Sequence, residues 1–186
     1  MKRGFTVLEL TLVGTLLSVV MLLMVQALTP CLRIWMATET VSEARTRGIL
    51  THQKVFAELR ASCEKSVNVS PLACSFLSIG QDGGFNPVNG APIYRQMVAY
   101  WLQNETLWRK SSVVPGLPTV TPFALNDAEL GTMCSGGKRV CSGISNYSLV
   151  KNGDHLWQLT LDTEVWTQKG KVRCRRESGL YFRNGT

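Results

Sequence analysis

One acidic residue stands inside a long apolar stretch near the start of the chain. From Phe5 to Leu28 the only charged side chain is Glu9. A carboxylate near the middle of a bilayer costs at least about 2.5 kcal/mol, and ionisable groups in such places usually have a partner and a function. Glu9 is therefore the first candidate functional residue, and its chemistry would be the pairing of a charge inside an apolar environment.

The stretch that carries Glu9 is long enough to cross a membrane as a helix. Its 24 residues would span about 36 Å at a helical rise of about 1.5 Å per residue, against a hydrocarbon core of about 30 Å. A cleaved secretory signal has a shorter apolar region and a cleavage site after that region. Here Lys2, Arg3 and Gly4 come before the apolar run. The positive charges keep this end in the cytoplasm, so the remainder is predicted to be extracytoplasmic.

The segment Gly4-Phe5-Thr6-Val7-Leu8-Glu9 at the head of such a helix resembles the type III signal of the type IV pilin and pseudopilin family. The resemblance implies that a prepilin peptidase removes the leader, residues 1–4, and that Phe5 becomes the N-methylated terminus. It also implies that the Glu9 carboxylate meets the terminal ammonium of a neighbouring subunit during assembly. Two charges that are costly alone in lipid would then offset each other.

By this resemblance the chain is expected to be a structural minor pilin or pseudopilin, which primes or caps a type IV pilus or a type II secretion pseudopilus. The segments 100–109 and 179–184 are similar to the larger W-type and J-type minor subunits. The implied partners are the prepilin peptidase, other pilin or pseudopilin subunits and the inner-membrane assembly platform. The implied location is the inner membrane, crossed once, and the fibre after assembly. The alternatives are a DNA-binding minor pilin of a DNA-uptake pilus and an unrelated signal-anchored extracytoplasmic domain.

A basic cluster near the end of the chain could contact DNA phosphates without base specificity. On a strand, Arg173 and Arg175 would project to one side. The alternative, which we favour, is a solvated face that protects the edge of a sheet from unwanted pairing. The cluster consists of Lys169, Lys171, Arg173, Arg175, Arg176 and Arg183, with Glu177 as the one acidic residue nearby.

Six cysteines without zinc-ligand spacing favour disulfides in an oxidising compartment. A bridge from Cys63 to Cys74 would tie the helix to the first strand. Cys134 could close on Cys141, or Cys141 could pair with Cys174 as strands near the C-terminus of pilins often do. These five cysteines of the predicted head leave at least one without a partner in the head, and their spacing does not decide the connectivity.

Nothing in the sequence indicates catalysis. There is no nucleophile elbow, phosphate loop or zinc motif, so we expect no enzymatic activity, no cofactor and no metal. The pairs Gly83-Gly84 and Gly136-Gly137 lack a strand-to-helix setting and are predicted turns. His52 has no second ligand at a suitable spacing and is predicted to be a packing residue.

The predicted fold class is α+β, with a pilin-like long helix packed on an antiparallel β-sheet head. The 186 residues and formal charge of +7 suit one modest domain and one long helix. Residues 5–28 form the membrane segment, Pro30 would kink or open the helix, and residues 29–67 continue it. A stripe of Ile49, His52, Phe56, Leu59 and Cys63 would face the head. The head, residues 68–186, has strands predicted at 74–79, 97–102, 106–110, 144–150, 156–167 and 172–183.

Overall fold

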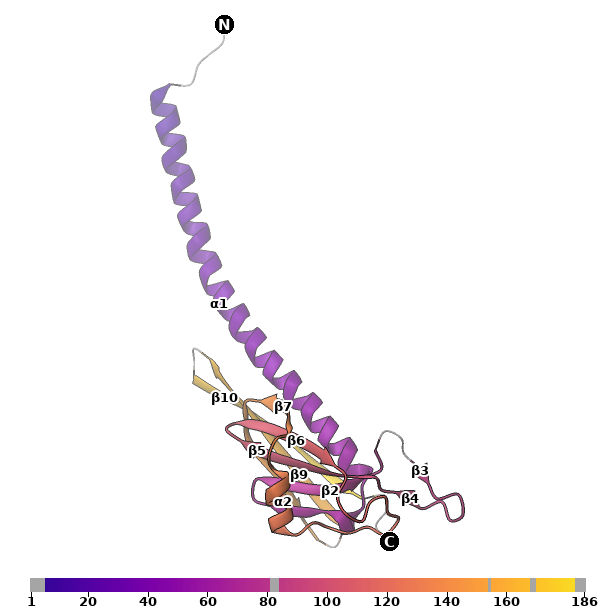
Figure 1. The fold of residues 1–186 in the computed structure, drawn as a ribbon. Coiled ribbons are helices and arrows are strands. Elements are labelled where there is room, and N and C mark those ends of the chain that lie inside the picture. The colour runs from indigo at the N-terminus through magenta and orange to yellow at the C-terminus, as the bar shows by residue number, and fades with distance from the viewer. Residues whose placement is uncertain (1–5, 81–83, 154, 168–169, 183–186) are drawn as a thin grey trace. The chain divides into compact units, whose positions relative to one another are not determined.

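The computed structural model of the chain describes residues 6–80, 84–153, 155–167 and 170–182. It divides into two compact units, Met1–Ser42 and Glu43–Thr186. One helix, α1 (Val7–Arg60), contributes to both units (Figure 1). α1 includes Pro30, the position where the sequence predicted a kink or an opening. It ends at Arg60, before the predicted end at Val67.

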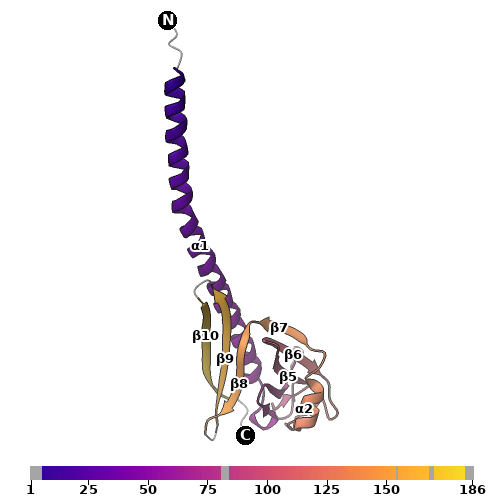
Figure 2. The same cartoon turned by 90° about the vertical axis from the view of Figure 1, so that its left-hand side faces the viewer.

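The second unit holds three antiparallel sheets. Figure 2 shows the two larger sheets side by side. The five-stranded sheet has the order β1 (Asn68–Ser70), β2 (Ala73–Ser78), β5 (Gln96–Gln103), β6 (Thr106–Ser112) and β7 (Lys138–Ser142). The three-stranded sheet has the order β10 (Gly170–Tyr181), β9 (Leu156–Thr167) and β8 (Ile144–Lys151). The remaining elements are β3 (Gly84–Phe85) paired with β4 (Pro92–Ile93), the 3-10 helix η1 (Glu64–Ser66), and α2 (Asp127–Met133).

The six predicted strands are confirmed, and the tight connection between β5 and β6 is a hairpin as expected. Asn104 and Glu105 both have positive φ, which is the backbone of a two-residue type I′ turn. Six elements were not predicted: η1, β1, β3, β4, β7 and α2. β7 lies in the segment where a bridge between Cys134 and Cys141 was one alternative, and α2 follows a loop rich in turn residues. The prediction of a single head sheet was wrong, because β8 to β10 form a sheet of their own.

The five-stranded sheet is covered on both faces, and β5 shows this most directly. Val98 and Tyr100 face one core cluster, which includes Leu59 of α1, whereas Met97 and Ala99 face a second cluster that includes Leu130 of α2. A strand that is buried on both faces reads as a continuous apolar run rather than an alternating one. This explains why residues 97–102 are apolar throughout.

The last turns of α1 pack on the head through a face that differs slightly from the predicted stripe. The buried residues of α1 are Gly48, Thr51, His52, Val55 and Leu59. A Cβ atom placed on Gly48 would lie 2.9 Å from Cγ2 of Thr163 in β9, so this crossing needs a residue without a side chain. His52 is buried and stacks on Phe56, as a packing residue would.

Candidate assembly site

The start of α1 is closed by a reciprocal pair of hydrogen bonds between Thr6 and Glu9. The Thr6 backbone N–H donates to Glu9 Oε2 at 2.9 Å, and the Thr6 hydroxyl donates to the same oxygen at 3.0 Å. In return, the Glu9 N–H donates to Thr6 Oγ1 at 3.3 Å. This is a capping box, in which two residues satisfy each other's free backbone donors. The carboxylate therefore has a partner within its own helix, and the spacing Thr-x-x-Glu was a signal for it in the sequence.

The side chains on either side of Glu9 are apolar and exposed, so its charge stands alone on this part of the helix surface. Val7, Leu8 and Leu10 are 81%, 75% and 69% exposed. Hydroxyl side chains further along the helix turn inward, since Thr11 and Thr15 donate to backbone carbonyls at 2.9 Å and Ser18 does so at 2.8 Å. Such bonds remove polar groups from the surface that a lipid or another helix would meet. Among the described residues, α1 is the one helix long and apolar enough to cross a membrane.

Two residues of the predicted site, Gly4 and Phe5, lie outside the described residues, and so does the rest of the leader. The structure thus places Glu9 and its cap but not the predicted cleavage and methylation position. Lys169 and Arg183 of the basic cluster also lie outside the described part of the chain.

Two carboxylates near the C-terminal end of α1 tie it to different sheets. Glu58 Oε2 accepts hydrogen bonds of 3.0 Å from Tyr100 Oη in β5 and from Arg109 Nε in β6. These bonds anchor the helix to the five-stranded sheet. In the sequence, Glu58 is 42 positions from Tyr100 and 51 from Arg109, so no local pattern predicted these contacts.

The second tie is Glu64 in η1, which joins the three-stranded sheet. Its carboxylate lies 2.8 Å from Lys151 Nζ and 3.0 Å from His155 Nδ1, and it accepts a hydrogen bond of 3.2 Å from Trp157 Nε1. The Glu64 side chain is only 13% exposed. Lys151 and His155 are the main causes that lower the pKa of Glu64 to about 2. Glu64 is therefore ionised in the folded protein over the whole physiological range.

Three residues of the predicted basic cluster are paired with acidic residues on β9 and β10. Lys171 bonds Glu164, and Arg173 Nη2 donates to Asp162 Oδ2 at 2.6 Å. Arg175 Nε donates to Asp162 Oδ1 at 3.1 Å. Burial raises the pKa of the Asp162 carboxyl, but the two guanidinium groups outweigh it and the net shift is downward. The positive charge of this strand is thus largely matched on its own surface.

Arg176 belongs to the same strand but has a different environment. It lies directly opposite Leu161 in the β9–β10 ladder, and successive side chains of a strand point to opposite faces. Its charge acts on His52 of α1, and burial together with Arg176 lowers the pKa of that histidine. Arg173 and Arg175 therefore share one face, as expected from the sequence, and Arg176 does not belong to it.

The five head cysteines are distributed over both core clusters and the surface. Cys74 belongs to the first cluster, where its Sγ lies 2.8 Å from Tyr147 Oη, and burial raises its pKa to about 12. Cys63 and Cys134 belong to the second cluster. The described cysteines show no bridge between Cys134 and Cys141 or between Cys141 and Cys174. Their oxidation depends on the compartment, so disulfide pairing stays a prediction.

No group of three or more His, Cys, Asp or Glu side chains that could hold a metal ion occurs among the residues that the structure describes. Comparison of the chain with protein-family models, with curated proteins and with solved structures gave no match in any of the three.

Proposed function

We propose that the chain is a structural subunit of the pilin-like class, a minor pilin or pseudopilin that enters a fibre through the N-terminal part of α1. The observation that carries this proposal is the single carboxylate of Glu9 at the start of a helix whose next turns are apolar and exposed. A helix with such a surface requires a lipid bilayer or a sheath of other helices around it. The helix-plus-sheet layout of the chain agrees with the proposal.

In the proposed assembly, Glu9 exchanges part of its own cap for a stronger partner. The hydrogen bonds from Thr6 are neutral–ionic contacts within one turn. A terminal ammonium from a neighbouring subunit would add a full opposite charge in a medium of low dielectric constant, where such attraction is large. The capping box provides hydrogen bonds to the carboxylate in the membrane before assembly. The terminal ammonium of the neighbouring subunit then fixes where this subunit sits in the fibre.

The partners in this proposal are a prepilin peptidase, which cuts between Gly4 and Phe5, an inner-membrane platform and other pilin-like subunits. The protein would cross the inner membrane once, with the second unit on the extracytoplasmic side. Its size and the segment 100–109 favour a priming or capping position among the larger minor subunits. We do not extend the proposal to DNA binding, because Lys171, Arg173 and Arg175 already have acidic partners.

The test is the N-terminal sequence and intact mass of the protein recovered from membranes, with and without an active prepilin peptidase. The expected product starts at Phe5 and carries one added methyl group when the peptidase is active, and it starts at Met1 when the peptidase is absent. A terminus at Met1 in both samples, or one beyond Leu28, would refute the proposal and leave a signal-anchored or exported β-rich domain.

A further inference from the structure

β10 forms one edge of the three-stranded sheet, and it differs from the other edges of the two larger sheets (Figure 2). It pairs with β9 through 12 consecutive residues without a register shift, and it contains no proline. Of the other edges, β1 has three residues, and the pairings of β7 and β8 each contain a register shift. Short strands, prolines and bulges protect an edge from the addition of another strand. β10 has none of these three features.

The direction of the free backbone groups of β10 follows from the hydrogen bonds of β9. The Glu164 N–H donates to the Gly143 carbonyl at 2.8 Å, and the Asn152 N–H donates to the Leu156 carbonyl at 2.7 Å. Even-numbered residues of β9 therefore bond towards β8, and its odd-numbered residues bond towards β10. In the ladder, these odd-numbered residues lie opposite even-numbered residues of β10. The odd-numbered residues of β10 consequently turn their N–H and C=O groups to the free edge: Lys171, Arg173, Arg175, Glu177, Gly179 and Tyr181.

This row of backbone groups is open. No hydrogen bond from the described part of the chain reaches it. Lys171, Arg173 and Arg175 have acidic partners on β9, so their side chains lean away from the free edge. Arg176 lies on the other face of the strand, where its charge helps to lower the pKa of His52 on α1. The edge protection that we favoured from the sequence therefore leaves the backbone groups themselves accessible.

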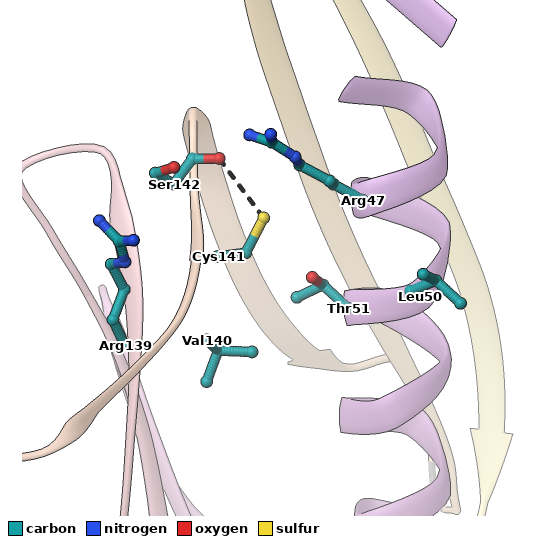
Figure 3. A pocket seen from close by; sticks show the side chains of 7 residues that line it. All are labelled: Arg47, Leu50, Thr51, Arg139, Val140, Cys141 and Ser142. Carbon is teal, nitrogen blue, oxygen red and sulfur yellow. Dashed lines mark hydrogen bonds between the residues drawn. The ribbon is translucent and has the colours of Figure 1, made fainter. Parts of the chain in front are cut away.

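A strand added to β10 would lie beside one flank of α1. The opposite flank faces β7 across a pocket of about 360 Å³, whose lining Figure 3 shows. The flank towards β10 carries Ile49, His52 and Phe56, which follow one another at spacings of three and four. Ile49 and Phe56 are half-buried. Every second side chain of an added strand would point to this flank, where apolar residues would cover Ile49 and Phe56 further.

The direction of the strands argues against a second copy of the chain as the occupant. Along β9, Trp157 bonds Glu64 just after the end of α1, whereas Thr163 lies against Gly48. β9 thus runs opposite to α1, and β10 runs in the same direction as the helix. Antiparallel pairing of two β10 edges would point the two helices in opposite directions, whereas two copies inserted in the same way into one membrane point in the same direction. Parallel pairing would bring the basic residues of both strands side by side, which is unfavourable.

We infer that the free edge of β10 binds a β-strand of a different pilin-like subunit, an inference that rests on the proposed function. The backbone of that strand would pair with the open row of N–H and C=O groups, as in other cases of strand addition. Its side chains would alternate between apolar residues towards α1 and polar residues towards solvent. The contact would hold the head of the neighbouring subunit alongside this one.

The experiment uses the full chain in its native membrane, with a photo-activatable benzophenone amino acid in place of Tyr181, which is 68% exposed. The expected cross-link joins this position to a peptide of another pilin-like subunit in which apolar and polar residues alternate. Gly179→Pro removes one free N–H without taking a hydrogen bond from β9, and edge strands tolerate proline at such positions. It should reduce the yield by about tenfold or more, because the ring stands where the partner strand would pair. The matched control is Val113→Pro, the introduction of proline at an exposed position after β6, which should retain the yield.

A second measurement needs no variant, so it holds even if proline disturbs the strand. Amide hydrogen exchange of residues 171–181 is compared between the native membrane and the detergent-solubilised chain. Exchange should be slower by about tenfold or more in the membrane, since the partner strand would bond the free N–H groups. The inference is overturned if Tyr181 gives no protein cross-link or one to a second copy, if Gly179→Pro and Val113→Pro behave alike, or if exchange is not slowed. Cleavage at Gly4 is measured in the same samples, so failure of the proposed function is recognised separately from failure of this contact.

Discussion

Arg175 and Asp162 lie directly opposite each other in the β9–β10 ladder, and Arg175 Nε donates a hydrogen bond of 3.1 Å to Asp162 Oδ1. The Asp162 side chain is fully buried, whereas that of Arg175 is 55% exposed. The guanidinium group of Arg175 thus binds the buried carboxylate on one side and contacts solvent on the other. The basic residues of β10 that have acidic partners therefore stabilise their own sheet.

DNA binding by this strand should be absent at physiological salt. Because Lys171, Arg173 and Arg175 have acidic partners, little net charge remains to displace counterions from phosphates. We expect no shift of labelled duplex DNA by the detergent-solubilised full chain at moderate salt. Binding that persists there and is lost in a Lys171→Gln variant would show that the prediction is wrong.

Removal of the Glu64 charge should destabilise the head in a manner that depends on pH. The pKa of Glu64 is lowered to about 2 in the folded protein. Its contribution is therefore complete above the unfolded value of about 4.5 and is lost as the pH falls from about 4.5 towards 2. Glu64→Gln should cost about 1 to 2 kcal/mol at pH 7, less than the full shift implies, because water screens the exposed charge of Lys151.

The measurement for Glu64 is the thermal midpoint of tryptophan fluorescence between pH 7 and pH 2.5. The difference between the native chain and Glu64→Gln should shrink across the acidic window. Glu105→Gln is the control, since Glu105 lies exposed in the β5–β6 turn and should change the midpoint little at any pH. A constant difference between the native chain and Glu64→Gln down to pH 2.5 would contradict the assignment.

The crossing of α1 over β9 should make the effect of Gly48→Ala depend on Thr163. A methyl group at position 48 would lie 2.9 Å from Thr163 Cγ2, closer than ordinary contact. We expect Gly48→Ala to destabilise the head by about 1 to 3 kcal/mol through overpacking. In a Thr163→Ala background the methyl group has room, and the same change should be neutral or stabilising by up to about 1 kcal/mol, since alanine favours helix. A double-mutant cycle by chemical unfolding measures this coupling.

Equal effects of Gly48→Ala in the two backgrounds would mean that the helix moves away from β9 without cost. Gly131→Ala is a useful reference, because Gly131 lies in α2 and a Cβ there meets nothing within 4 Å. That variant should show no dependence on Thr163.

Loss of the Glu9 carboxylate should separate insertion from assembly. Glu9→Ala removes a charge that is costly in lipid, so membrane insertion should be retained, and cleavage after Gly4 should still occur. Recovery of the protein with other pilin-like subunits after cross-linking should fall about tenfold, since the ammonium loses its partner. Ser18→Ala is the matched control, because its hydroxyl bonds only the Gly14 carbonyl of the same helix. Equal recovery of the two variants would speak against an assembly role.

Local patterns in the sequence were enough to predict α1 and most of the strands. They also singled out Glu9 as the only charged residue of the apolar segment. The apolar run of residues 5–28 and the alternation of Trp157, Leu159 and Leu161 depend on neighbours within a few positions. Such periodicity is set by helix and strand geometry alone. The same applies to the Thr6–Glu9 cap, whose spacing is visible in the sequence although its hydrogen bonds are seen only in the structure.

The tertiary structure decided which charges meet and how the strands divide into sheets. Asp162 reaches Arg175 because of the register of β9 and β10, and Glu64 reaches Lys151 because two distant segments pack together. β7 is a strand through its pairing with β6, and it follows the predicted turn at Gly136-Gly137 in a segment where no strand was predicted. These contacts depend on long-range register and burial, which the sequence around each residue does not encode. The pocket between α1 and β7 exists for the same reason, since its two walls are distant in the chain and meet only in the folded head.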